Sequence, residues 1–75
     1  MKKISPIDTI IARNIKNARA RRSLSLKYVS AKMGIAYQQL QKYESASNRI
    51  SAGRLWELSQ IYKTPVKDFF TPKTI

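Results

Sequence analysis

The sequence contains neither cysteine nor histidine. The lack of cysteine excludes disulfides, and the lack of both residue types excludes a zinc site of the usual kind. Nucleophile–base pairs built on cysteine or histidine are excluded as well, so we expect no enzymatic activity, no metal and no cofactor. Because the chain has only 75 residues, we expect a single domain over residues 1–75 with a small core over about residues 7–70.

Acidic residues are scarce. Four Asp and Glu stand against fifteen Lys and Arg, which gives a net charge of +11 at neutral pH. No acid lies between Asp8 and Glu44, although cations recur throughout that stretch. An excess of this kind predicts a polyanionic partner such as DNA, RNA or an anionic membrane. The alternative is a solvated basic surface that only keeps the protein soluble.

Long apolar runs are missing too. No run approaches the roughly 20 residues that a membrane-spanning helix needs. The N-terminal stretch is interrupted by Pro6 and Asp8 before a signal-peptide core forms. Together with the lack of cysteine, this predicts a cytoplasmic protein with no membrane partner, and no small-molecule ligand is evident.

Helix signals begin at Ser5, Pro6 and Asp8. Serine suits the cap, proline suits the first helical position, and Asp8 has the spacing of a capping box. A helix is therefore predicted from here to about Arg22, with one apolar stripe at helical spacing made by Ile7, Ile11, Ile15 and Ala18. Ser25 indicates the cap of a second, two-turn helix over Leu26–Met33.

Gly34 follows the second helix at the position where a left-handed residue is expected. A third helix is predicted to start near Tyr37, with Leu40 and Tyr43 facing inward. Residues 45–50 form a predicted loop, Ser51 caps a fourth helix over residues 52–62, and a last short helix opens at residues 64–65. The aromatic residues Trp56, Phe69 and Phe70 are predicted to be core, the alternative being a partly exposed aromatic in a dimer interface.

The segment IAYQQLQKYE, residues 35–44, is polar but carries little charge. Two short helices joined by a tight glycine-containing turn are the arrangement of a helix-turn-helix. The segment covers the end of that turn and the second of the two helices. In that arrangement the second helix lies in the DNA major groove. A glutamine amide can form hydrogen bonds with adenine there, whereas a positively charged side chain mainly binds phosphate. The segment therefore indicates base reading.

From about Ile11 to Phe70 the sequence resembles the Cro/C1 family of helix-turn-helix repressors. The family pattern combines an arginine in the first helix, a leucine-serine entry to the second, a turn glycine, and a glutamate that closes the third. The matching residues here are Arg19, Leu24, Ser25, Gly34 and Glu44. The later run QLQKYESASNRISAGRLWELSQIYKTPVKDFF is similar to a bacterial subgroup of that family. The resemblance implies an all-α, compact five-helix, lambda-repressor-like DNA-binding domain.

The resemblance also implies a function and a site. It implies a bacterial or phage regulator of transcription, nucleoid-associated, that represses by binding double-stranded DNA as a homodimer at an inverted repeat. The residues that it assigns to base reading are Tyr37, Gln38, Gln39, Gln41 and Lys42. Those that it assigns to phosphate are Ser25, Lys27, Asn48 and Arg49. It pairs Arg19 with Glu44 in a structural salt bridge.

Four positions depart from the family pattern. Many relatives carry glutamine in place of Leu26, whose side chain cannot hold a phosphate. Relatives usually have glycine in place of Ala46 and a small alanine in place of Ser30. They have serine or threonine in place of Ala36, which is a poor helix cap and costs roughly 1 kcal/mol.

Other functions fit parts of the same pattern. An antitoxin or a restriction-modification controller uses this fold to bind DNA while serving a protein partner. An RNA-binding or coactivator-bridging module of the same fold predicts no preference for a duplex sequence. A cationic membrane-surface peptide is disfavoured because several capped helices carry core patterns. Independently of these functions, the alternative to base reading is that Gln38 and Gln39 are plain surface residues of a good helix former.

Overall fold

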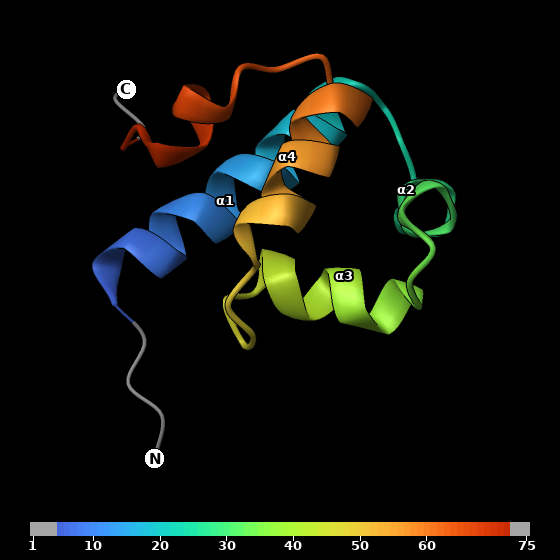
Figure 1. Cartoon of the computed structure of the whole chain (residues 1–75), viewed down its shortest axis with the longest axis horizontal. Coiled ribbons are helices and arrows are strands. Elements are labelled where there is room, and N and C mark those ends of the chain that lie inside the picture. The colour runs from blue at the N-terminus through green and yellow to red at the C-terminus, as the bar shows by residue number, and fades with distance from the viewer. Residues whose placement is uncertain (1–4, 73–75) are drawn as a thin grey trace.

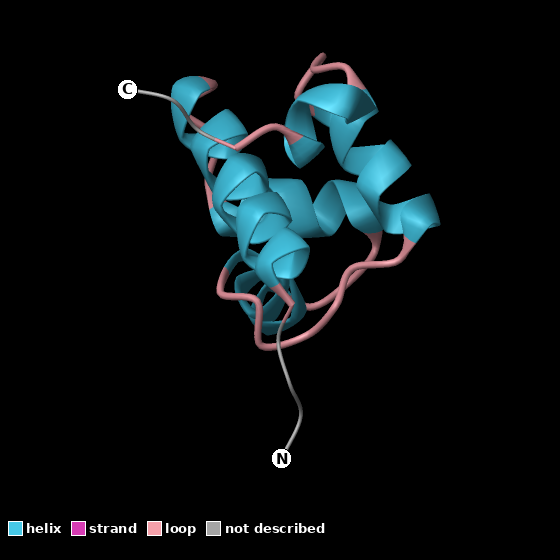
Figure 2. Cartoon of the chain, turned by 90° about the vertical axis from the view of Figure 1, so that its left-hand side faces the viewer, coloured by secondary structure: helices cyan, strands magenta, loops and turns pink. Residues whose placement is uncertain are grey.

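The computed structural model describes residues 5–72, which form helices and loops without a strand in that range (Figures 1 and 2). The elements in chain order are α1 (Pro6–Arg21), α2 (Leu26–Met33), α3 (Tyr37–Glu44), α4 (Ala52–Ile61) and η1 (Val66–Phe70). The all-α prediction is confirmed, but the last of the five expected helices is a 3₁₀ helix. Its five residues follow Pro65 and precede Pro72, which leaves room only for a short, tight turn.

Serine caps decide where three of the α-helices begin. The hydroxyl of Ser5 accepts from the backbone N–H of Asp8 at 3.4 Å. Ser25 accepts from Tyr28 N–H at 3.0 Å, and Ser51 accepts from Arg54 N–H at 3.1 Å. Each hydroxyl satisfies one backbone donor that the first turn of a helix leaves free. The predicted starts of α1, α2 and α4 are therefore confirmed.

The turn between α2 and α3 depends on Gly34. Its φ of 71° lies in the left-handed region, where a residue without Cβ is at no disadvantage. The N–H of Ile35 then donates to the carbonyl of Ser30 at 3.0 Å, which closes the C-terminus of α2. Ala36 occupies the N-cap position of α3 and offers no side-chain cap. The start of α3 is thus set by the turn and by packing.

The core lies where α1, α2, α3 and α4 face one another. Ile15, Leu40, Leu58 and Tyr62 have no exposed surface, and they belong to one cluster with Phe69 of η1. The amide of Asn14 holds η1 against α1 by donating to the carbonyls of Phe69 and Thr71, at 2.9 and 2.8 Å. Figure 1 accordingly shows the last turn of the chain folded back beside α1.

Two aromatic residues that were expected in the core are exposed. Trp56 is 58% exposed and Phe70 43%, so the core prediction is wrong for them, and Ile7 at the start of the apolar stripe is 41% exposed. Trp56 directly follows the buried Leu55, and Phe70 directly follows the buried Phe69. Successive side chains of a helix point in different directions, so the residue after a buried one can face solvent. Ile7 lies in the first turn of α1, where this helix extends past the other elements (Figure 1). None of the described helices is long and apolar enough to cross a membrane.

Candidate nucleic-acid interface

Helices α2 and α3 are steeply inclined to each other. In Figure 1 the viewer looks nearly along α2, while α3 lies across the lower edge of the molecule. The connection consists only of residues 34–36, so the N-terminus of α3 follows directly on the turn. This is the geometry of a helix-turn-helix, in which the second helix is presented at one edge of the domain.

The surface of α3 divides into an inner and an outer side. Leu40 is fully buried and Tyr43 is half-buried against the core. Four of the five predicted base-reading residues are exposed, and Gln39 is half-buried. The exposed four are Tyr37, Gln38, Gln41 and Lys42. The outer side therefore offers amide donors and acceptors together with one phenol and one ammonium group.

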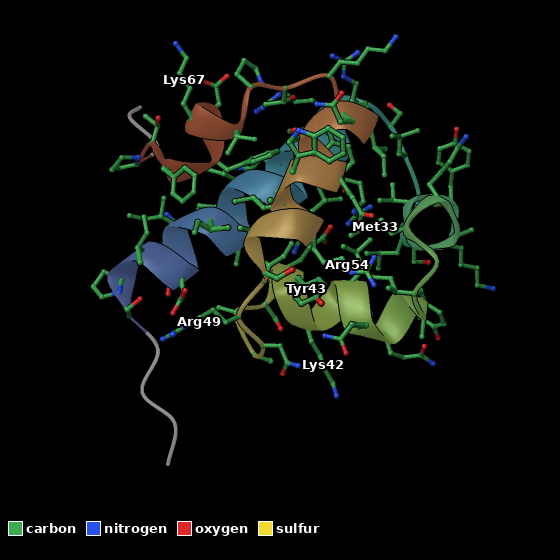
Figure 3. The ribbon with its side chains drawn as sticks, viewed as in Figure 1. Met33, Lys42, Tyr43, Arg49, Arg54 and Lys67 are labelled. Atoms are coloured by element: carbon green, nitrogen blue, oxygen red, sulfur yellow. The ribbon has the colours of Figure 1, made fainter. Side chains whose placement is uncertain are left out.

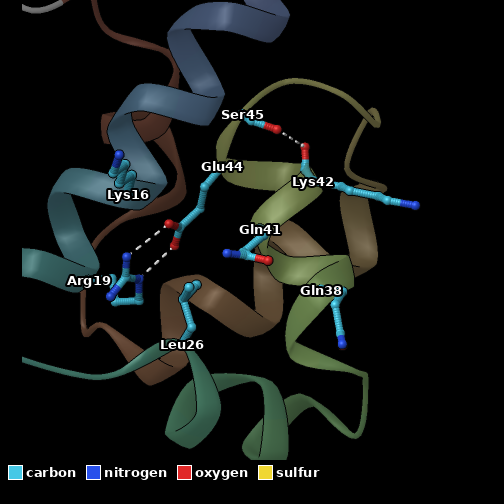
Figure 4. Close-up of a pocket in the computed structure, with 8 residues that line it drawn as sticks. All are labelled: Lys16, Arg19, Leu26, Gln38, Gln41, Lys42, Glu44 and Ser45. Carbon is cyan, nitrogen blue, oxygen red and sulfur yellow. Dashed lines mark hydrogen bonds and ion pairs between the residues drawn. The ribbon is translucent and has the colours of Figure 1, made fainter.

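A groove of about 660 Å³ runs along this outer side, between α3 and the neighbouring helices α1 and α2 (Figure 4). Gln38, Gln41 and Lys42 line it from α3, and Lys16 lines it from α1. Leu26 lines it from α2, so an apolar side chain occupies this part of the groove. Any phosphate contact at this point must come from the backbone or from the neighbouring cations.

A second groove, of about 460 Å³, continues the first along α1. The two grooves share Lys16, Glu44 and Ser45, and the second adds Arg13. Both Arg13 and Lys16 are exposed. Sequence reasoning left these two cations out of the predicted site. Their position off the apolar stripe of α1, within the acid-free stretch, was a sequence signal for both cations. The placement of Lys16 in one groove with Lys42 is a property of the fold.

An ion pair between α1 and α3 fixes the position of α3. Arg19 Nε lies 2.7 Å from Glu44 Oε2, and Arg19 Nη2 lies 3.0 Å from Oε1. Arg19 Nη1 also donates to the carbonyl of Leu24 at 2.9 Å. The hydrogen bond to Glu44 raises the pKa of Arg19 above its ordinary value, with the charge of Glu44 acting in the same direction and burial opposing it. A two-pronged contact of this kind sets orientation as well as distance.

The predicted phosphate-binding residues lie near opposite ends of α3. At the N-terminal end, the Lys27 ammonium stands 6.0 Å from the centre of the Tyr37 ring. The hydroxyl of Ser25 caps α2, so a phosphate there would meet backbone N–H groups. At the C-terminal end, the N–H of Asn48 donates to the carbonyl of Lys42 at 3.2 Å.

Arg49 belongs to the same C-terminal end and is 71% exposed. Its Nε donates to Asp8 Oδ2 at 3.1 Å, which ties the loop after α3 to the first turn of α1. Lys42 and Arg49 lie on the same side of the molecule in Figure 3, and Lys67 lies on the opposite side. Asp8 also accepts from the Ser5 hydroxyl at 2.9 Å, and this bond, followed by the charge of Arg49, lowers the pKa of Asp8 despite some desolvation.

The sequence profile of the family described as helix-turn-helix matches residues 15–69. This chain belongs to the helix-turn-helix family. Within the described residues, no group of three acidic side chains gathers as a metal site would require. The matched residues include α2, the glycine-containing turn and α3.

Curated relatives of this helix-turn-helix protein include an HTH-type transcriptional regulator from Sinorhizobium medicae (strain WSM419), 41% identical over 69 residues. An HTH-type regulator from Rhizobium meliloti (strain 1021) has the same identity, and each match covers 92% of this chain and 50% of the relative. A transcriptional regulator in the ATPase CF(0) region of Rhodospirillum rubrum is 31% identical over 68 residues, covering 91% of this chain and 63% of the relative. The chain thus spans about half the length of the first two relatives.

Proposed function

We propose that this helix-turn-helix protein binds a specific sequence of double-stranded DNA through α3 in the major groove. One observation carries the proposal. The exposed side of α3 presents the amides of Gln38 and Gln41, and cations flank it on the neighbouring helices and loop. Side-chain amides can distinguish base edges by hydrogen bonding, and cations bind the phosphates on either side of the DNA major groove.

The residues of α3 and those around it have different proposed roles, which depend on their position. Tyr37, Gln38, Gln39, Gln41 and Lys42 read or approach bases, since they form the first two turns of α3. Ser25 and Lys27 contact phosphate near the start of α3, and Asn48 and Arg49 contact phosphate beyond its end. Lys16 and Arg13 extend the cationic surface along α1. The pair of Arg19 and Glu44 holds α3 at a fixed angle to α1 and touches no DNA.

The biological role that follows is regulation of transcription, by repression at an operator. The names of the bacterial relatives as transcriptional regulators support the regulation of transcription, and repression is our proposal from the family resemblance. A homodimer with two-fold symmetry would place two copies of α3 on an inverted repeat, with half-sites about one helical turn apart. In this proposal residues 1–75 act as one lambda-repressor-like DNA-binding domain that needs no cofactor.

The test is to incubate the purified protein with fragmented genomic DNA at about physiological salt and to sequence what it retains. We expect an inverted repeat among the retained fragments. Gln38→Ala should weaken binding to that repeat by about 1–3 kcal/mol and relax the base preference at one position of each half-site. Gln60→Ala, which removes an exposed amide from α4, is the matched control and should leave binding unchanged.

Phosphate contacts give a second readout. Lys16→Ala should weaken binding to all sequences about equally and reduce the slope of log affinity against log salt by about 1. Equal retention of all fragments, with no effect of Gln38→Ala, would contradict operator binding. A preference for RNA over the same duplex would instead support the RNA-binding alternative.

A further inference from the structure

A separate groove lies on the side of the molecule away from α3. It is formed where the end of α1, the middle of α2 and the end of α4 meet. The Arg22 side chain joins two of these segments by donating from Nη2 to the carbonyl of Lys63 at 3.4 Å. Figure 1 shows the C-terminal end of α4 and the connection from α1 to α2 at the top of the molecule, with α3 at the bottom.

The groove has two connected parts. One part, of about 410 Å³, is lined by Tyr28 and Lys32 of α2 and by the end of α4. The other, of about 370 Å³, leads to Trp56. Both parts share Gln60 and Lys63, so they form one elongated surface, which we call the α4 groove. Neither α3 nor the loop that follows it contributes to the lining of the α4 groove.

The α4 groove combines exposed aromatic rings with cations. Trp56 is 58% exposed and lines one part of the groove, and Tyr28 is 50% exposed and lines the other. The ammonium of Lys32 stands 5.5 Å from the centre of the Tyr28 ring, which orders both side chains. Exposed tryptophan and tyrosine are the residues that most often anchor a protein partner.

The cations of the α4 groove have no acidic partner in the described residues. Asp8, Glu44 and Glu57 pair with other arginines, and Asp68 makes no ion pair in the described structure. Arg22, Lys32 and Lys63 therefore present uncompensated positive charge around an apolar floor that includes Leu24 and Ile61. A complementary occupant carries negative charge and apolar side chains together.

We propose that the α4 groove binds an acidic segment of another protein that carries apolar side chains. A second copy of this chain offers no such segment, because its four acidic residues are scattered along the sequence and three of them pair with arginines in the described structure. A duplex phosphate backbone matches the cations but provides nothing for Tyr28 and Trp56. Because the α4 groove and the face of α3 share no residue, the acidic partner and DNA can be bound at the same time.

The test uses the intrinsic fluorescence of Trp56, since the chain contains one tryptophan. The probe is a short synthetic peptide that alternates glutamate with leucine, and the comparison peptide has serine in place of leucine. We expect the leucine peptide to shift the emission of Trp56 to shorter wavelength and to bind about tenfold more tightly than the serine peptide. Lys32→Ala and Tyr28→Ala should each weaken its binding about tenfold.

Lys67→Ala is the matched control, because it removes one exposed positive charge outside the α4 groove. Thermal unfolding by circular dichroism verifies that each variant is folded. Equal binding of the two peptides, or equal losses in Lys32→Ala and Lys67→Ala, would reduce the effect to general charge attraction and overturn the proposal. Displacement of the peptide by duplex DNA would also overturn the proposal, as would an emission shift that self-association of the protein causes without peptide. The assay contains DNA only in that competition, so its failure leaves operator binding untouched.

Discussion

The ion pair between Arg19 and Glu44 leads to the sharpest prediction for stability. The Glu44 side chain is 6% exposed and the Arg19 side chain 16% exposed. Glu44→Gln keeps the shape of the side chain but removes its charge, which leaves the guanidinium of Arg19 without a counter-ion in a largely buried site. Breaking one member of such a pair costs about 3–5 kcal/mol. We expect the lower end of that range, about 3 kcal/mol, because Arg19 keeps some contact with water.

That loss is large for a domain of this size. At about 0.05–0.15 kcal/mol per residue, a chain of 75 residues has an unfolding free energy of roughly 4–11 kcal/mol. Urea denaturation followed by far-ultraviolet circular dichroism measures the difference directly. The midpoint should fall in Glu44→Gln while the slope of the free energy against urea stays the same.

A double variant tests the physical reason. Replacing both residues by apolar side chains of similar size, as Arg19→Met with Glu44→Leu, removes the pair without stranding a charge. We expect this double variant to lose less stability than Glu44→Gln alone. A loss below about 1 kcal/mol in Glu44→Gln, or a double variant that loses the sum of its single changes, would refute the reasoning.

Three further predictions concern the helix ends and the loop. Ala46 has a φ of 62°, so Ala46→Gly should raise the unfolding free energy by about 0.5–1 kcal/mol, whereas the control Ala31→Gly inside α2 should lower it by about 1 kcal/mol. Urea midpoints that fall equally in both would contradict this. Ala36 offers no cap to α3, so Ala36→Ser and Ala36→Asp should each stabilise by about 1 kcal/mol. Only the aspartate should weaken DNA binding in a mobility-shift titration, because in the proposed complex its charge would lie close to phosphate at the start of α3. Equal affinities of the two variants would count against the proposed face. The pKa of Asp8 is lowered from its ordinary value of 3.8. The ionised carboxylate therefore stabilises the fold at pH values above 3.8, and this contribution is lost as the pH falls through the lowered pKa. The difference in melting temperature between wild type and Asp8→Asn should therefore narrow in acid, and a constant difference would show that Arg49 and Ser5 do not act through the charge.

Helix positions were predictable because their signals are local. Ser5, Ser25 and Ser51 cap a backbone N–H three residues further on, and Gly34 takes the left-handed conformation that ends α2. The family was predictable for a related reason, since several short motifs occur in the right order along the chain, and that prediction is confirmed. The assignment of particular side chains to bases and phosphates remains a prediction.

Burial was less predictable where one helical step decides the outcome. Trp56 and Phe70 follow buried neighbours, and their hydrophobicity alone favoured the core. The direction of each side chain depends on which side of its element the rest of the protein covers. That information is absent from the local pattern and appears only when α4 and η1 are packed.

The sequence by itself determined the all-α class, the position of the turn, the polar character of α3 and the excess of positive charge. Each of these depends on hydrogen bonds, residue spacing or composition within a few residues. The tertiary structure decided which distant groups meet: Arg49 with Asp8, Lys16 with Lys42 along one groove, and Tyr28 with Lys63 and Trp56 along another. Such encounters depend on how whole helices pack, because side chains that are far apart in the chain come together only after the core has fixed the angles between the helices.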